Sequence, residues 1–117
     1  MAERIVIYQK PTCSTCRSVY KALQSSGVDF DTVDYYVEPI GKPKLKELLR
    51  KMGMRAAELL RTKEPLYRTL GIDANGMSDD ALVDLMVQHP DLIQRPIVER
   101  GARAVLARPA GRLKEIL

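Results

Sequence analysis

The stretch IVIYQKPTCSTC, residues 5–16, decides the fold that we expect for this chain. It opens with a short apolar run rich in β-branched side chains, which predicts a buried strand ending before Pro11. Apolar residues then recur at helical spacing from Cys16 onward, and either Thr12 or Ser14 can cap the start of that helix. The two cysteines therefore lie between a strand and the first turn of a helix.

A second strand and a run of helices follow. Gly27 ends the first helix, and residues 29–35 alternate between polar and apolar side chains, which predicts a half-buried strand and completes a βαβ unit. The middle of the chain shows helical periodicity and no strand signal. The expected helices lie at residues 44–52, 55–60 and 64–70 and in a segment that Ser78 caps and Pro90 ends.

The last third of the chain returns to β-structure. Residues 96–99 and 104–107 are predicted to be short strands joined by a hairpin turn, and a short helix follows at the C-terminus. The order β-α-β, helices, β-β-α is typical of an α/β thioredoxin-like fold with a four-stranded mixed sheet. We expect a single domain in which residues 1–37 and 94–117 form this core and residues 38–93 form a helical insertion.

Composition and charge exclude several classes of protein. A chain of 117 residues with 45% hydrophobic content can bury one modest core. The net charge of +4 is spread over scattered basic residues without a block of like charges, so direct nucleic-acid binding is not expected. No apolar run is long enough for a signal segment or a membrane span, so we expect a cytoplasmic protein without a membrane partner. We also expect a monomer.

The cysteine content restricts the chemistry further. The chain has two cysteines, fewer than a secreted disulfide scaffold usually carries, and with the single His89 they cannot supply four zinc ligands without carboxylates. We therefore expect no metal and no bound cofactor. A CxxC pair between a strand and a helix predicts thiol redox chemistry, although two cysteines can also pack as small apolar side chains.

The position of each cysteine predicts its role. Free N–H groups and the dipole at a helix N-terminus stabilise a thiolate, and such a cysteine has a pKa between roughly 3.5 and 7.5 instead of about 8.5. Cys13 precedes the first turn, where its sulfur is best placed and most exposed, so we expect it to be the attacking thiolate. Cys16 lies one turn later on the apolar face of the helix, so we expect a more buried, resolving thiol.

Further motifs carry a resemblance over essentially the whole chain. They are residues 7–13, 59–61, 64–65, 88–98 and 108–109. In this combination the sequence resembles the arsenate reductase/Spx (ArsC-like) family of thioredoxin-fold proteins, in its glutaredoxin-coupled branch.

The resemblance implies a set of site residues. In these reductases a cysteine attacks arsenate, and its position corresponds to Cys13. Three arginines hold the oxyanion there, and they correspond to Arg61, Arg95 and Arg108, since guanidinium forks suit tetrahedral oxyanions. Pro96 corresponds to the cis-proline that faces the cysteine loop.

Two positions depart from the reductase pattern. Gln9 stands where the reductases often carry a histidine four residues before the nucleophile, so Cys13 is expected to rely more on the helix and the arginines. Cys16 occupies a position where the reductases usually have no cysteine. Those enzymes take the resolving thiol from glutathione and glutaredoxin. The resemblance therefore implies glutathione with glutaredoxin, or thioredoxin acting on the Cys13–Cys16 pair, as the reductant.

Two functions follow from these residues, and we favour the first. It is a thiol-dependent, arsenate reductase-like enzyme acting on arsenate or a related oxyanion, with Cys16 or glutathione as the resolving thiol. The alternative is a Spx-like regulator that binds the C-terminal domain of the RNA polymerase α subunit and senses oxidation through Cys13 and Cys16. Arg108 favours the enzyme, because Spx proteins generally lack the third arginine.

Overall fold

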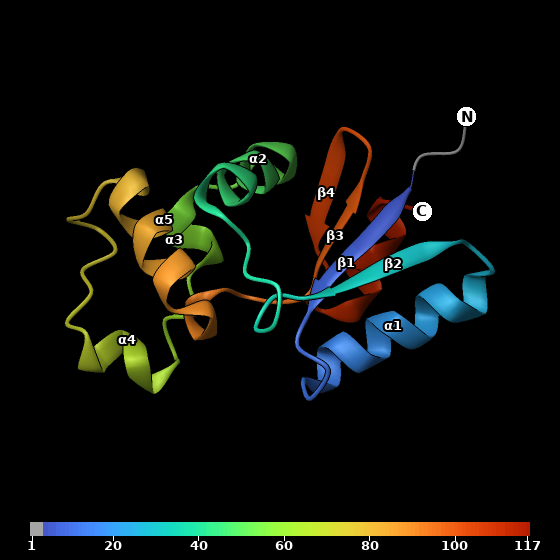
Figure 1. The fold of residues 1–117 in the computed structure, drawn as a ribbon, viewed down its shortest axis with the longest axis horizontal. Helices are drawn as coiled ribbons and strands as arrows, with labels where there is room; N and C mark the ends of the chain where they lie inside the picture. Colours follow the sequence, from blue (N-terminus) through green and yellow to red (C-terminus); the bar gives the residue numbers. More distant parts are fainter. Residues whose placement is uncertain (1–3) are drawn as a thin grey trace. The chain divides into compact units, whose positions relative to one another are not determined.

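The computed structural model describes residues 4–117 of the chain, so residues 1–3 of the predicted core lie outside the described part. The described residues form two compact units. One unit contains the described residues up to Glu38 together with Arg95–Leu117, and the other is Pro39–Gln94. In Figure 1 the first unit is the part that contains the sheet, and the second is a group of helices.

A four-stranded mixed sheet forms the frame of the first unit. β1 (Ile5–Gln9) pairs in parallel with β2 (Phe30–Asp34) and antiparallel with β3 (Ile97–Arg100), which in turn pairs antiparallel with β4 (Arg103–Leu106). The strand order is β2-β1-β3-β4, and α1 (Ser14–Ser26) connects the two parallel strands (Figure 1). This arrangement confirms the α/β fold class and the thioredoxin-like sheet predicted from the sequence.

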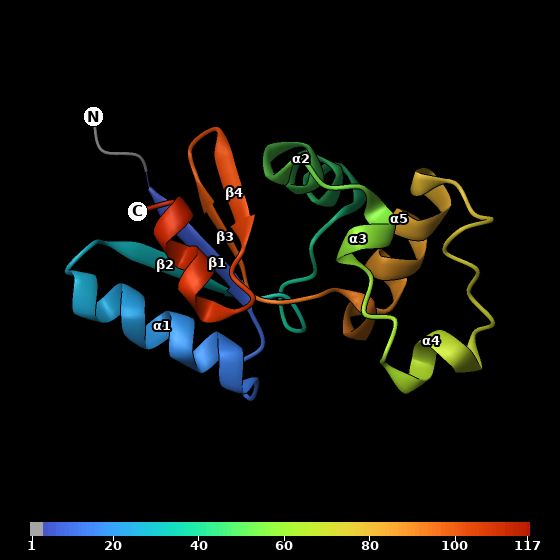
Figure 2. The same ribbon diagram turned by 180° about the vertical axis from the view of Figure 1, so that it is seen from behind.

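One face of the sheet carries the apolar core of this unit. Successive side chains of a strand point to opposite faces, so Ile5 and Ile7 of β1 lie on the same side. Helix α1 and the C-terminal 3-10 helix η2 (Ala110–Glu115) lie against that side (Figure 2). The buried cluster consists of Ile5, Ile7, Val19, Leu23, Val98, Val105, Ala107, Leu113 and Ile116. This packing fixes the start of α1 beside the end of β1.

The second unit is built from short helices. They are α2 (Lys42–Met52), α3 (Ala56–Leu59), α4 (Pro65–Thr69), α5 (Asp79–Gln88) and the 3-10 turn η1 (Pro90–Leu92). Gly53 ends α2 in the left-handed conformation, with φ 64°. Ser78 caps α5 as predicted, since its Oγ accepts a hydrogen bond from the N–H of Ala81 at 3.2 Å. No helix within residues 4–117 is long and apolar enough to cross a membrane.

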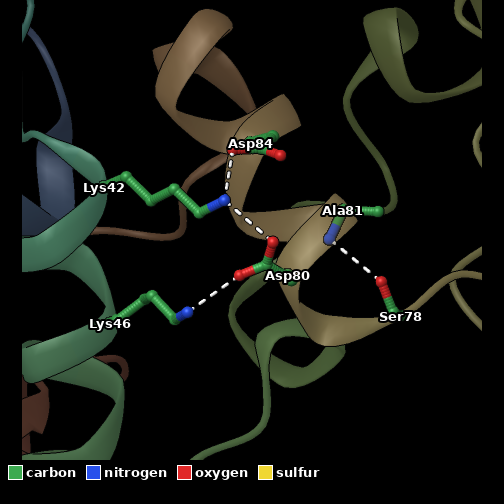
Figure 3. A network of polar contacts seen from close by, with 6 residues as sticks. All are labelled: Lys42, Lys46, Ser78, Asp80, Ala81 and Asp84. Carbon is green, nitrogen blue, oxygen red and sulfur yellow. Dashed lines mark hydrogen bonds and ion pairs between the residues drawn. The ribbon is translucent and has the colours of Figure 1, made fainter.

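A network of ion pairs joins α2 to α5 inside this unit (Figure 3). Lys42 Nζ lies 2.8 Å from a carboxylate oxygen of Asp80 and 2.9 Å from one of Asp84. Lys46 Nζ lies 2.8 Å from the other oxygen of Asp80, and hydrogen bonds from the two ammonium groups lower the pKa of Asp80 to about 2. Because these side chains are exposed to solvent, the network contributes little to stability.

Candidate active site

The sulfur of Cys13 caps the N-terminus of α1. Cys13 has extended backbone angles (φ −79°, ψ 127°), and its Sγ accepts a hydrogen bond from the backbone N–H of Cys16 at 3.4 Å. The prediction that Thr12 or Ser14 is the cap is therefore wrong. Helix α1 begins at Ser14, so the cysteine itself occupies the capping position. Its sulfur lies at the positive end of the helix dipole.

This position explains the acidity of Cys13. Partial burial alone would raise the pKa of Cys13, but the backbone N–H and the thiol of Cys16 donate hydrogen bonds to its sulfur. The Arg95 guanidinium adds a further hydrogen bond and a positive charge, and together these groups lower the pKa from 9.0 to about 7. Much of Cys13 is therefore thiolate, the reactive form, near neutral pH.

Cys16 differs from Cys13 in exposure and in acidity. Its side chain is fully buried on the apolar face of α1. Burial raises its pKa to about 12 despite a hydrogen bond with the Lys10 backbone, and the hydrogen bond and charge of Cys13 add to the increase. Both cysteines are free thiols. The pair thus combines an accessible thiolate with a buried, protonated thiol.

Arg95 holds a guanidinium beside the Cys13 sulfur. Its Nη1 donates a hydrogen bond to the Tyr36 hydroxyl at 3.5 Å, and Tyr35 forms another. Burial alone would lower the pKa of Arg95, but the two tyrosines and Cys13 favour its charged form and raise the pKa. The buried Nε has no hydrogen-bond partner among the described residues. The guanidinium therefore keeps an unused donor in the neighbourhood of the thiolate.

Arg108 lies next to Arg95. Its Nη1 donates a hydrogen bond to the backbone oxygen of Arg95 at 3.2 Å, and its own side chain is exposed. Arg95 precedes Pro96 through a cis peptide bond, as the resemblance implies, and Arg108 also precedes a cis-proline, Pro109, which the sequence did not predict. The oxygen of Pro96 accepts a hydrogen bond from the N–H of Ala107 at 3.0 Å. The structure thus brings together two of the three predicted site arginines, Arg95 and Arg108, through this hydrogen bond.

Two further predicted site residues have other surroundings. Gln9 is buried, at 8% exposure, in the last position of β1. Arg61 belongs to the second unit, where its backbone N–H donates to the Leu92 oxygen at 2.7 Å. Its Nη1 donates to the Asp91 oxygen at 3.0 Å and lies 3.3 Å from a carboxylate oxygen of Glu64. The roles of Gln9 and Arg61 toward the cysteine stay predictions.

Reasoning from the sequence missed the aromatic residues around Arg95. Tyr35 is 1% exposed, and its ring centroid lies 5.1 Å from that of Tyr36. The Nζ of Lys10 lies over the Tyr36 ring, 4.6 Å from its centroid. The signal that could have found them is their position directly after β2. Because β1 and β2 are parallel, the residues that follow both strands meet at one edge of the sheet.

The groups gathered at this edge suit the attack of a thiolate on an anion. Cys13 supplies the nucleophile, and Arg95 with Arg108 supplies fixed positive charge and N–H donors. Within residues 4–117 no group of three or more histidine, cysteine or acidic side chains is arranged to hold a metal ion.

Comparison with known proteins gives consistent matches over the full length. The family model described as "ArsC family" matches residues 8–116. The uncharacterized protein YfgD of Escherichia coli is 36% identical over 100% of this chain and 99% of its own, and an arsenate reductase of Neisseria meningitidis is 32% identical over 97% of both. A solved structure of an arsenate reductase from Vibrio cholerae is 35% identical, with a TM-score of 0.94 over 100% of both chains.

Proposed function

This chain belongs to the ArsC family, and from that premise we propose that it is a thiol-dependent arsenate reductase whose nucleophile is Cys13. One observation carries the assignment to this residue: the Cys13 sulfur caps a helix and accepts a hydrogen bond from the backbone N–H of Cys16, and the Arg95 guanidinium nearby helps to lower its pKa. A cysteine activated in this way is suited to attack the arsenic atom of a bound oxyanion. The names of its relatives give no better support to the Spx-like regulator.

The arginines are proposed to hold the oxyanion during this attack. Arg95 has an unused buried Nε–H, and the exposed guanidinium of Arg108 is hydrogen-bonded to the backbone oxygen of Arg95. Guanidinium groups bind tetrahedral oxyanions through paired hydrogen bonds, and their charge offsets the repulsion between a thiolate and an anion. Arg61 is proposed as the third arginine of the set on the resemblance alone.

The reductant is proposed to be a thiol system. The As(V)–sulfur adduct on Cys13 needs one further thiol for its reduction to arsenite. Either glutaredoxin with glutathione, or thioredoxin, then regenerates the reduced protein.

We propose the cytoplasm as the location of this protein, because that compartment keeps thiols reduced. Arsenate resembles phosphate and sulfate in shape, so arsenic reduction is the property that separates this function from mere oxyanion binding.

The test is NADPH-coupled arsenate reduction, with glutathione and glutaredoxin in one arm and thioredoxin with its reductase in the other. Wild type is expected to consume NADPH in an arsenate-dependent way in at least one arm, and Cys13→Ser in neither. Arg103→Lys, on the exposed end of β4, is the matched control and should retain the wild-type rate. The absence of arsenate-dependent turnover by wild type in both arms would refute the proposed function.

A further inference from the structure

Cys16 is the reactive group that the proposed function leaves unassigned. It has 0% exposure, so a reagent from solution cannot reach its sulfur while α1 is folded. The sequence contains no cysteine other than Cys13 and Cys16. If Cys16 takes part in the chemistry of the reduced protein, its partner sulfur must therefore be that of Cys13.

The local geometry favours this pairing. Cys13 and Cys16 occupy the N-cap and the third position of α1, and residues three apart on a helix face the same side. The two residues are already in contact, because the Cys16 backbone N–H donates a hydrogen bond to the Cys13 sulfur at 3.4 Å. A partner held in place in this way reacts with an effective concentration that can reach roughly 10⁵ M or more.

We propose that Cys16 is the resolving thiol of the arsenate reductase reaction, so that arsenite is released by an internal Cys13–Cys16 disulfide and no glutathione enters this step. The inference rests on the proposed function and names the second thiol of that same site. It also names the partner class: an external dithiol protein that reduces a disulfide whose accessible sulfur is that of Cys13.

The reaction balances in three steps. The Cys13 thiolate attacks arsenic and forms an As–S bond, while an oxygen of arsenate takes up protons and leaves as water. The Cys16 thiol then gives its proton, through solvent, to the departing arsenite oxygen and attacks the Cys13 sulfur, so an S–S bond forms and the As–S bond breaks. Its electron pair stays on arsenic, which is reduced from As(V) to As(III) as two thiols are oxidised to a disulfide. An external dithiol reduces that disulfide and is itself oxidised.

The environment of Cys16 also orders these steps. While Cys13 is a free thiolate, its charge and hydrogen bond help to keep Cys16 protonated and therefore a weak nucleophile. Formation of the As–S bond removes the thiolate charge from the Cys13 sulfur. Arg95, which lowers the pKa of Cys16, remains nearby. The second thiol is therefore easier to ionise only after the first has reacted.

A single-turnover experiment tests the proposal. Fully reduced wild type is freed of external thiols and mixed with excess arsenate, and arsenite and remaining free thiols are then measured after acid quenching and denaturation. The expected yield is about one arsenite per chain, with both thiols lost and an intact mass lower by two hydrogens. Cys16→Ser and Cys16→Ala should release less than about a tenth of this arsenite, because no second thiol is available.

The matched control keeps two thiols but moves the second one. Ser18 is exposed on α1 and, two residues beyond Cys16, faces a different side of the helix. The double variant Cys16→Ser with Ser18→Cys should release as little arsenite as Cys16→Ser alone. Added glutathione with glutaredoxin should restore turnover to the Cys16 variants, which shows that they are folded and still form the adduct on Cys13.

Two failures are distinguishable. If wild type reduces arsenate with glutathione and glutaredoxin but keeps both thiols and releases no arsenite without them, the proposed function stands and the role of Cys16 is refuted. That role is also refuted if the double variant releases as much arsenite as wild type in the absence of external thiols. If wild type yields no arsenite under either condition, the arsenate reductase function itself fails.

Discussion

Two helix N-termini of this protein share one capping geometry and differ in chemistry. Cys13 caps α1 and Ser78 caps α5, each with extended backbone angles, and each side chain accepts a hydrogen bond from the N–H three residues later. The first turn of α5 carries Asp79 and Asp80, which neutralise the positive end of the helix dipole. The first turn of α1 carries no acidic residue. The same local motif is therefore structural in α5 and leaves an unneutralised positive end for a thiolate in α1.

The largest expected effect on activity comes from replacing the Cys13 sulfur, which separates the capping role of this side chain from its chemistry. In Cys13→Ser the hydroxyl can still cap α1, so the free energy of unfolding should stay within about 1 kcal/mol of wild type. Arsenate reduction should fall at least about 10³-fold, because a serine hydroxyl at this position has no base to activate it. Urea unfolding and the coupled assay measure the two quantities. A Cys13→Ser variant that keeps a tenth of the wild-type rate would contradict the assignment of Cys13.

Removing the Arg95 guanidinium tests the positive charge that lies beside the Cys13 sulfur at the start of α1. Arg95→Met should lower kcat/KM for arsenate roughly 10- to 100-fold, since a charge-assisted pair of hydrogen bonds to the oxyanion is lost. It should also raise the pKa of Cys13 above about 7, because Arg95 helps to lower it. Steady-state kinetics and thiolate absorbance against pH give both values. Arg103→Met, on the exposed hairpin, is the control and should change neither.

The cap of α5 should matter for stability alone. Ser78→Ala removes the oxygen that accepts from the Ala81 N–H and should destabilise the protein by about 1 kcal/mol. The rate per folded molecule should be unchanged, because the residue has no part in the proposed reaction. Urea unfolding at constant slope measures the loss, and Ser18→Ala, in the exposed middle of α1, provides a control without a cap. A fall in kcat with unchanged stability would show that α5 is not merely structural.

The comparison also separates what the sequence could predict from what it could not. The β-branched apolar run of β1, the alternation of polar and apolar residues in β2 and the helical spacing of apolar residues in α1 predicted the sheet and its covering helix, since burial in the core selects apolar side chains at these positions. The capping residue was mispredicted, because capping preferences rank serine and threonine and give no reason to choose a cysteine. The Cys13 sulfur receives the hydrogen bond that the prediction gave to an oxygen, and this bond helps to lower the pKa of Cys13.

Contacts between distant segments were the least predictable part of the site. Tyr35 and Tyr36 contact Arg95 although they lie far from it in sequence, and 59 residues separate Tyr36 from Arg95. No local sequence pattern encodes such a pairing. The motif at residues 88–98 pointed to Arg95 as a site residue, but only the parallel pairing of β1 with β2 explains why tyrosines that follow β2 hold it. Local periodicity predicts elements, whereas the surroundings of the thiolate depend on how those elements meet.

The smallest expected effect comes from making the start of α1 resemble that of α5. Ser14→Asp places a carboxylate in the first turn, next to the exposed side of Cys13, where it stabilises the helix but repels the thiolate. Since the acid form of Cys13 is then favoured, its pKa should rise by about 0.2 to 0.7 from a value of about 7. The rate of the wild-type reaction should increase with pH as Cys13 ionises, so this profile should shift to higher pH in the variant. Ser14→Asn, which has the same shape without the charge, should leave the pH profile of the rate unchanged. An equal shift in both variants would mean that the charge of the first turn does not control the acidity of Cys13.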